Sequence, residues 1–252
     1  MDTEIEEEYR KNILKAEQGD VDAMVELGNC LSSGEGVEIN ARKAFEWYKK
    51  AAEKGSATGM VRLSYCYLNG EGVEKDGKTG LYWAEKAASL RNLLGMMSAA
   101  YCYQNGTGCE KNPAKSASYF QMAANLGEPD AEREIALCYL EGRGVEYDLE
   151  KGVYYMKKAA EDCDCSSAKV YMGKLYEEGK GVQKDTMAAA DYYKEAIEFD
   201  EDAEAQYRLG LLYLRGDGVI TNRAKGQQLL FRAAMQGNQD AVKALMANQK
   251  KR

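Results

Sequence analysis

Four of the seven cysteines recur at a constant spacing, and cysteine side chains can bind metals, form disulfides or react with oxidants. Each stands 36 residues after the one before: Cys30, Cys66, Cys102 and Cys138. In two later copies the corresponding position holds Leu175 and Leu212. Helices packed one repeat apart lie roughly 8–10 Å from each other, beyond the Cα separation of a disulfide. Because the position accepts leucine as well as cysteine, we predict four free thiols at small apolar packing sites.

Cys163 and Cys165 form a separate pair, which has the spacing of a redox pair or of half a metal site. A metal site would need further ligands, and the chain has no histidine and no second close cysteine pair. We interpret the segment as a tolerated loop insertion that binds no metal. A reactive, exposed thiol pair is the alternative.

The sequence has few of the residue types and patterns that are typical of catalytic sites. The absence of histidine removes the commonest general base, the commonest metal ligand and every histidine-dependent triad. The Gly-x-Gly doublets follow predicted helices, whereas the dinucleotide-binding fingerprint follows a strand and carries a third glycine. Paired carboxylates with catalytic spacing do not stand out among the many acidic residues. The sequence therefore predicts a protein that is not an enzyme, with no catalytic residue and no cofactor.

Charge and composition restrict the partners and the compartment. The formal net charge is −7 and the sequence pI is near 5.0, which disfavours nucleic acid and anionic membranes as partners. The first eight residues are acidic, unlike the basic start of a secretory signal. No stretch approaches the ~20 apolar residues that cross a bilayer. We expect a cytoplasmic protein; a periplasmic or secreted one would require a signal that was removed.

A repeat of 36 or 37 residues organises the chain. Its first sign is a glycine doublet: Gly34/Gly36, Gly70/Gly72, Gly106/Gly108, Gly142/Gly144, Gly179/Gly181 and Gly216/Gly218. In the same frame follows a capping residue: Asn40, Asp76, Asn112, Asp148, Asp185 and Asn222. A bulky residue comes next, at Trp47, Trp83, Tyr119, Tyr155, Tyr192 and Leu229. An alanine follows without exception, at Ala51, Ala87, Ala123, Ala159, Ala196 and Ala233.

These spacings describe pairs of helices. A small residue at Ala44, the bulky Trp47 and the alanine at Ala51 fall on one face of a helix. The Asn or Asp before each such helix is a good N-cap. The glycine doublet lets the chain leave a first helix and turn back into a second one. We call the first helix of each copy helix A and the second helix B. The two one-residue insertions, in 161–167 and 198–204, are expected in loops between a helix B and the next helix A.

These motifs resemble the Sel-1-like repeat, a relative of the tetratricopeptide repeat. The resemblance rests on Ala23-x-x-x-Leu27-Gly28, Gly34-x-Gly36-Val37 and Lys43-Ala44-x-x-Trp47-Tyr48-x-x-Ala51-Ala52. It implies an all-α fold, a right-handed α-solenoid superhelix of about fourteen helices in a single domain, 1–252. We expect six repeats over 20–56, 57–92, 93–128, 129–165, 166–202 and 203–238. A capping helix in 1–19 and another in 239–252 close the stack. Gly59 and Gly95 depart from the family pattern, which has alanine there.

The resemblance also implies a function, because Sel-1-like repeats generally act as adaptors. We expect a scaffold that binds a partner protein or peptide in the concave groove lined by the A helices. One alternative is an inhibitor or immunity-type protein that occludes one effector enzyme. A second alternative is a secreted factor that interacts with a host.

Helix A residues that are not needed for packing are the candidates for partner binding. Counting from the repeat frame, they are Val61, Tyr65, Asn69, Met97, Tyr101, Asn105, Arg133, Lys174 and Tyr207. Tyrosine buries a large ring and keeps a hydrogen bond, so Tyr65 and Tyr101 are the expected centre of the groove. Arg133 and Lys174 would favour acidic residues of the partner. The alternative is that these side chains only complete the packing between repeats.

Overall fold

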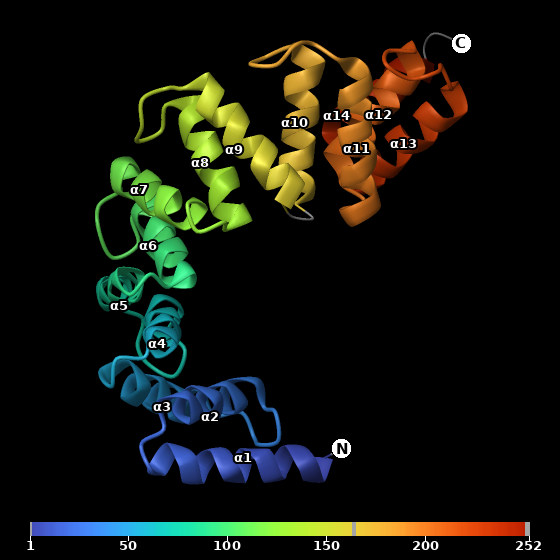
Figure 1. Cartoon of the computed structure of the whole chain (residues 1–252). Coiled ribbons are helices and arrows are strands. Elements are labelled where there is room, and N and C mark those ends of the chain that lie inside the picture. Colours follow the sequence, from blue (N-terminus) through green and yellow to red (C-terminus); the bar gives the residue numbers. More distant parts are fainter. Residues whose placement is uncertain (1, 163–164, 250–252) are drawn as a thin grey trace. The chain divides into compact units, whose positions relative to one another are not determined.

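The computed structural model describes residues 2–162 and 165–249, and every regular element in these ranges is an α-helix (Figure 1). The A helices are α2 (Val21–Ser33), α4 (Ala57–Asn69), α6 (Leu93–Asn105), α8 (Pro129–Glu141), α10 (Ser166–Glu178) and α12 (Ala203–Arg215). The B helices are α3 (Ala41–Glu53), α5 (Gly77–Ser89), α7 (Pro113–Ala124), α9 (Leu149–Asp162), α11 (Thr186–Asp200) and α13 (Arg223–Met235). Helices α1 (Asp2–Glu17) and α14 (Gln239–Gln249) flank them. Within residues 2–162 and 165–249, the prediction of about fourteen helices without strands is confirmed.

The predicted N-caps begin the B helices. The Asn40 side chain accepts a hydrogen bond from the Lys43 amide at 3.0 Å, and Asp148 accepts one from Lys151 at 3.0 Å. Pro113 stands in the first turn of α7, where its missing N–H costs no helical hydrogen bond.

The two glycines of each doublet have different tasks. Gly70 ends α4 in the left-handed conformation, with φ 81°, and its N–H donates to the Cys66 carbonyl. Gly72 also has a positive φ, and a Cβ there would lie 2.1 Å from the Ala41 carbonyl oxygen. The second glycine therefore lets the turn after α4 pass against the start of α3.

The contacts between Cα atoms group the chain into two compact units, Met1–Leu126 and Gly127–Arg252. Unit 1 holds α1 to α7, and its core includes Leu27, Tyr48 and Leu63. Unit 2 holds α8 to α14 and buries residues such as Met156 and Tyr193. The single-domain prediction stays a prediction, and the units are described separately below.

The glycines that depart from the family pattern lie at close helix contacts in unit 1. A Cβ on Gly59 would lie 2.8 Å from the Ala51 Cβ and 2.9 Å from the Ala52 amide nitrogen. A Cβ on Gly95 would lie 2.6 Å from the Ala87 Cβ. Glycine therefore allows α4 to approach α3, and α6 to approach α5, more closely than alanine would.

One buried position of the repeat holds an apolar residue in unit 1 and a polar or charged residue in unit 2. In unit 1 it holds Met24, Met60 and Met96. In unit 2 it holds Glu132, Lys169 and Gln206, which are also buried. Glu132 forms an ion pair with Lys158 of α9, and Lys169 forms one with Glu195 of α11. Two of these buried side chains, Glu132 and Lys169, are therefore each paired with a more exposed charge from a B helix.

The second one-residue insertion, expected in a loop over 198–204, lies partly in a helix. Helix α11 has 15 residues, against 13 in α5, so part of the added length extends the helix. Glu201 then ends it in the left-handed conformation, with φ 47°. Extension at a helix end leaves the register of the helix body unchanged. The first insertion includes residues 163–164, which lie outside the described residues.

Candidate functional site

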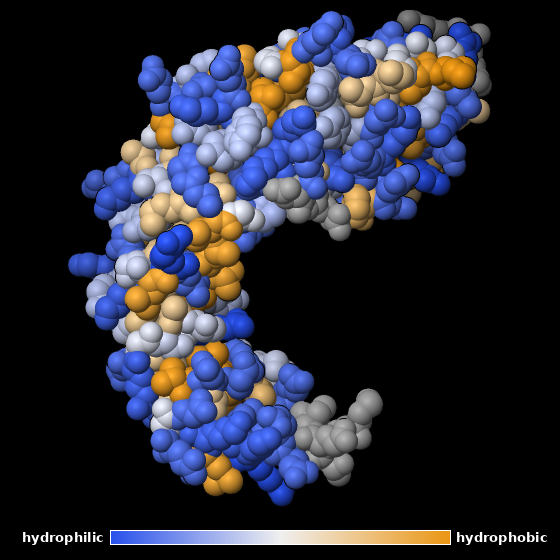
Figure 2. All heavy atoms as spheres, in the orientation of Figure 1, coloured by the Kyte–Doolittle hydropathy of each residue, from blue (hydrophilic) through white to orange (hydrophobic). Residues whose placement is uncertain are grey.

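The A helices of unit 1 expose one face whose residues are spaced as i, i+4, i+7 and i+11, which is one side of a helix. We call it the α4–α6 face and define it as Thr58, Arg62, Tyr65 and Asn69 of α4 with Leu94, Ser98, Tyr101 and Asn105 of α6. Helices α4 and α6 contact each other directly, so the two rows form one surface. Figure 2 shows hydrophobic residues, in orange, gathered over α6.

The predicted tyrosines and amides of unit 1 lie on this face. Tyr65 is 52% exposed, and Asn69 and Asn105 are exposed. The Asn69 side chain donates to the Tyr65 carbonyl at 3.1 Å. Tyr101 is half-buried, and its ring meets the Phe120 ring edge-on with the centroids 5.2 Å apart. Tyr65 is therefore free of the core, whereas Tyr101 also contributes to packing.

Val61 and Met97 lie beside the face rather than on it. Both are half-buried, and Val61 packs against the core of unit 1. Sequence reasoning missed Arg62, which is exposed, and Leu94, which is 63% exposed. The four-residue spacing from Arg62 back to Thr58 and from Ser98 back to Leu94 is the signal that would have found this row.

In unit 2 the predicted cations have partners of their own. Arg133 has a side chain that is 23% exposed, and its Nη2 lies 2.8 Å from Glu134 Oε1. Lys174 Nζ lies 3.2 Å from Glu204 Oε1, and Arg208 Nε lies 2.7 Å from the same oxygen. These positive charges are therefore largely neutralised within the chain.

The carboxylate of Glu204 shows the strength of this network. Burial acts to raise the pKa of Glu204, but hydrogen bonds and positive charge from Arg208 and Lys174 outweigh burial. Its pKa therefore lies below the ordinary value. Arg208 also pairs with Glu177 at 3.2 Å, and Glu177 accepts a hydrogen bond from the Tyr193 hydroxyl at 2.8 Å.

Tyr207 is the remaining predicted residue. It is half-buried and packs against Leu230, Ala233 and Ala241 of α13 and α14. Apart from Val61 and Met97, the predicted residues thus form two sets, one of four and one of three. Tyr65, Tyr101 and the two amides share a surface in unit 1, whereas Arg133, Lys174 and Tyr207 engage neighbours in unit 2.

The regularly spaced cysteines lie where a packing role predicts them. Cys66, Cys102 and Cys138 are buried and Cys30 is half-buried, all as free thiols. Burial raises the pKa of the Cys66 thiol to about 11 and that of Cys102 to about 11, aided by nearby Glu71 and Cys109 respectively. A raised pKa disfavours the reactive thiolate.

The other cysteine pair is described only in part. Cys165 is a half-buried free thiol whose sulfur lies 3.2 Å from the Ser167 hydroxyl. Cys163 lies outside the described residues. Among the described residues, no three Cys, Asp or Glu side chains are grouped to hold a metal ion. No described helix has the length and apolar character to cross a membrane.

The chain matches the Sel1 repeat family model six times, over residues 21–56, 57–92, 93–128, 129–162, 166–198 and 203–238. None of the curated proteins matches it. Among solved structures it is similar to a protective antigen of uropathogenic Escherichia coli that displays the same repeat fold, with 28% identity and a TM-score of 0.90. That alignment covers 94% of this chain but 50% of the antigen, so the chain spans about half the antigen's length.

Two further structures extend the comparison. A Sel1 repeat protein from Oxalobacter formigenes is 27% identical with a TM-score of 0.76, and the alignment covers 90% of this chain and 99% of that one. An immunity protein from Pseudomonas aeruginosa is 19% identical with a TM-score of 0.50, over 86% and 81% of the two chains, and shows the fold alone. Sel1 repeat proteins are generally scaffolds for protein interactions. With six matched repeats along its length, this chain belongs to the Sel1 repeat family.

Proposed function

We propose that the chain is a non-catalytic scaffold that binds a partner protein through the α4–α6 face. The observation that carries the proposal is the exposure of two large side chains on adjacent A helices, Tyr65 at 52% and Leu94 at 63%. Exposed polar side chains, Arg62, Asn69 and Asn105, surround them.

This composition favours protein recognition. Exposed apolar side chains with a polar rim are typical of protein-binding surfaces. Tyrosine and arginine are enriched among the residues that contribute most to binding energy. Tyr65 also brings a hydroxyl beside the Glu71 carboxylate, whose charge raises the pKa of the tyrosine and keeps it protonated. The side chain therefore offers an apolar ring and a neutral hydroxyl to a partner.

The test compares two double variants of unit 1. Tyr65→Ala with Leu94→Ala truncates the face, whereas Tyr82→Ala with Met122→Ala truncates side chains of the B helices that are 52% and 42% exposed. A partner is first isolated from the source cell with the parent chain, and the affinity of each variant is then measured by calorimetry. We expect the face variant to lose about 2–4 kcal/mol of binding free energy and the control less than about 0.5 kcal/mol. Equal affinities of the face variant and the parent would refute the proposal.

A further inference from the structure

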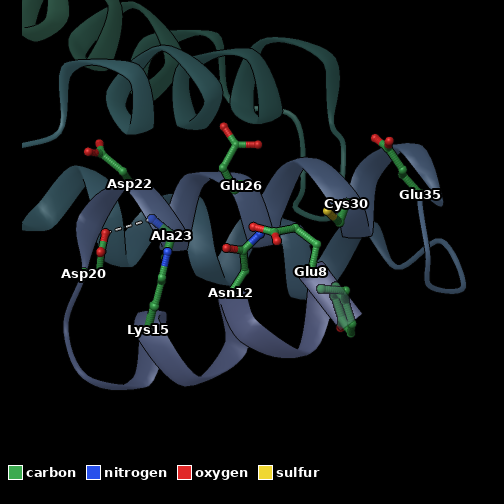
Figure 3. A pocket seen from close by; sticks show the side chains of 10 residues that line it. Glu8, Asn12, Lys15, Asp20, Asp22, Ala23, Glu26, Cys30 and Glu35 are labelled. Atoms are coloured by element: carbon green, nitrogen blue, oxygen red, sulfur yellow. Dashed lines mark hydrogen bonds between the residues drawn. The ribbon is translucent and has the colours of Figure 1, made fainter. Parts of the chain in front are cut away.

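An acidic cleft of about 760 Å³ lies between α1 and α2 in unit 1 (Figure 3). Its lining includes five carboxylates and one ammonium group: Glu8, Asp20, Asp22, Glu26, Glu35 and Lys15. One carboxylate oxygen of Asp20 already has a partner, because it accepts a hydrogen bond from the Ala23 amide at 3.0 Å as the N-cap of α2. The remaining carboxylates leave a clear excess of negative charge around the cleft.

An amide with no partner lies inside this cleft. Asn12 of α1 is 8% exposed, and its side chain makes no hydrogen bond to any residue that the structure describes. Figure 3 shows the amide group between the side chains of Glu8 and Lys15, in the space between the two helices. The Asn12 amide lines the cleft and is bound to no other described residue there, so its carbonyl oxygen and its NH₂ group are available to a ligand that enters the cleft.

The repeat frame shows that packing does not require an amide here. Moving from Asn12 in steps of 36 residues reaches Tyr48, Ala84 and Phe120, all on B helices. These three side chains are buried in the core, with exposures of 4%, 0% and 0%. Helix α1 therefore carries a polar group at a position where the B helices of unit 1 carry core residues.

The negative charge of the cleft affects the thiol of Cys30, which is part of its lining. Burial raises the pKa of Cys30, and the charges of Glu35, Glu26 and Glu8 raise it further. Lys11 lies 3.8 Å from Glu8, but both side chains are 61% exposed, so water screens this pair. A cation that enters the cleft would therefore meet carboxylates from α1, α2 and the turn after α2.

The cleft continues the proposed binding face. In the repeat frame, Asp22 and Glu26 of α2 correspond to Thr58 and Arg62 of α4. The acidic lining thus lies in the same row of A-helix positions that exposes Tyr65 and Leu94 farther along unit 1. A partner that binds along this row would contact the carboxylates of the cleft and then the apolar side chains of the α4–α6 face.

We propose that the cleft binds the guanidinium or ammonium side chain of a basic segment in a partner protein. The inference rests on the proposed function, since it takes the partner to be a protein. The carboxylates neutralise the cation, and the Asn12 carbonyl oxygen accepts one of its N–H groups. Arginine fits best, because its planar group presents several N–H donors in fixed directions and stays charged.

The experiment uses acetylated tetra-arginine amide as probe and tetra-citrulline, its uncharged analogue, as reference. Affinity is measured by fluorescence anisotropy, and the Asn12 side-chain amide signals are followed by NMR. Glu8→Gln with Glu26→Gln removes two charges from the cleft. Glu46→Gln with Glu53→Gln removes two from α3, where the side chains are 58% and 57% exposed, and leaves the same net charge.

We expect tetra-arginine to bind the parent at least about tenfold more tightly than tetra-citrulline and to shift the Asn12 amide signals. The cleft variant should lose about tenfold in affinity and the α3 variant less than about twofold. Equal losses in both variants would reveal binding by overall charge and overturn the proposal. Unmoved Asn12 signals would overturn it as well. Spermidine binding as tightly as the peptide would overturn the assignment to a protein segment.

The Tyr65→Ala, Leu94→Ala variant separates this inference from the proposed function. The probe has no apolar side chain, so this variant should bind tetra-arginine as the parent does. If partner binding proves insensitive to Tyr65 and Leu94 while the peptide results hold, the proposed function fails and the cleft stands. If partner binding depends on Tyr65 and Leu94 but the peptide results fail, the proposal of a cation-binding cleft is refuted and the proposed function stands.

Discussion

Lys169 Nζ lies 3.1 Å from Glu195 Oε2, an ion pair in which the lysine side chain is 9% exposed and the glutamate 53% exposed. The lysine also lies over the Phe199 ring, 4.5 Å from its centroid. In unit 1 the same repeat position holds a buried methionine, such as Met60. A lysine with buried methylene groups and a paired charge therefore takes the place of an apolar side chain.

This substitution pattern leads to a stability prediction. Lys169→Met should leave the midpoint of urea unfolding close to that of the parent, because methionine fills the site and the exposed Glu195 stays hydrated. Lys169→Ala should lower the stability by about 1–3 kcal/mol through lost packing. Urea unfolding followed by circular dichroism measures both. Equal destabilisation by Met and Ala would show that the ion pair, and not the packing, stabilises this site.

Gly95→Ala is expected to destabilise the fold although alanine is the better helix former. In an open helix the change would stabilise by about 1 kcal/mol. Here the added Cβ would lie 2.6 Å from the Ala87 Cβ and 2.8 Å from the Ala88 amide nitrogen. Overpacking of this kind costs about 1–3 kcal/mol, so the net change should be a loss.

The matched test of this contact is a double-mutant cycle with Ala87→Gly. Removing the Ala87 Cβ relieves the nearest clash, so the double variant should be more stable than the sum of the two single changes predicts. Thermal unfolding of the parent and the three variants gives the coupling. Additive effects would mean that α5 and α6 do not meet at these residues.

The thiols should react in two classes. In the folded protein, Cys66, Cys102 and Cys138 are buried, so a thiol reagent should modify them only on unfolding. Half-buried Cys30, Cys109 and Cys165 should react first. Titration in denaturant without reductant should find all four regularly spaced cysteines as thiols. Loss of these four from the titration would show that they form disulfides.

The raised thiol pKa values also predict a loss of stability at alkaline pH. Burial raises the pKa of Cys66 and of Cys102 to about 11 in the folded chain, whereas the pKa of an unperturbed thiol is about 8.5. Ionisation thus favours the unfolded chain, and this contribution to stability is complete below pH ~8.5 and is lost as the pH rises toward 11. The melting temperature should fall over this range, and less so in Cys66→Ala with Cys102→Ala. An equal fall in parent and variant would assign the effect to other groups.

The repeat frame made most of the fold predictable, whereas the binding surface was predictable only in part. Caps such as Asn40 act within four residues, so the sequence reveals them directly. The rotation of each A helix depends on how closely its neighbours approach. That approach is decided at contacts such as Gly95 with Ala87, so the repeat frame alone predicts an exposed position for Met97, which is half-buried. The sequence around Lys174 predicts a cation for a partner, because the anion that pairs with it, Glu204, stands 30 residues farther along the chain.

Site-specific photocrosslinking shows directly whether a partner protein contacts the α4–α6 face. A photoreactive phenylalanine analogue replaces Tyr65 of α4 in one protein and Tyr82 of α5 in another, two tyrosines that are each 52% exposed. After irradiation in the source cell, we expect a specific crosslinked partner from position 65 and none from position 82. A partner crosslinked from position 82, with none from position 65, would contradict it and place the binding surface on the B helices.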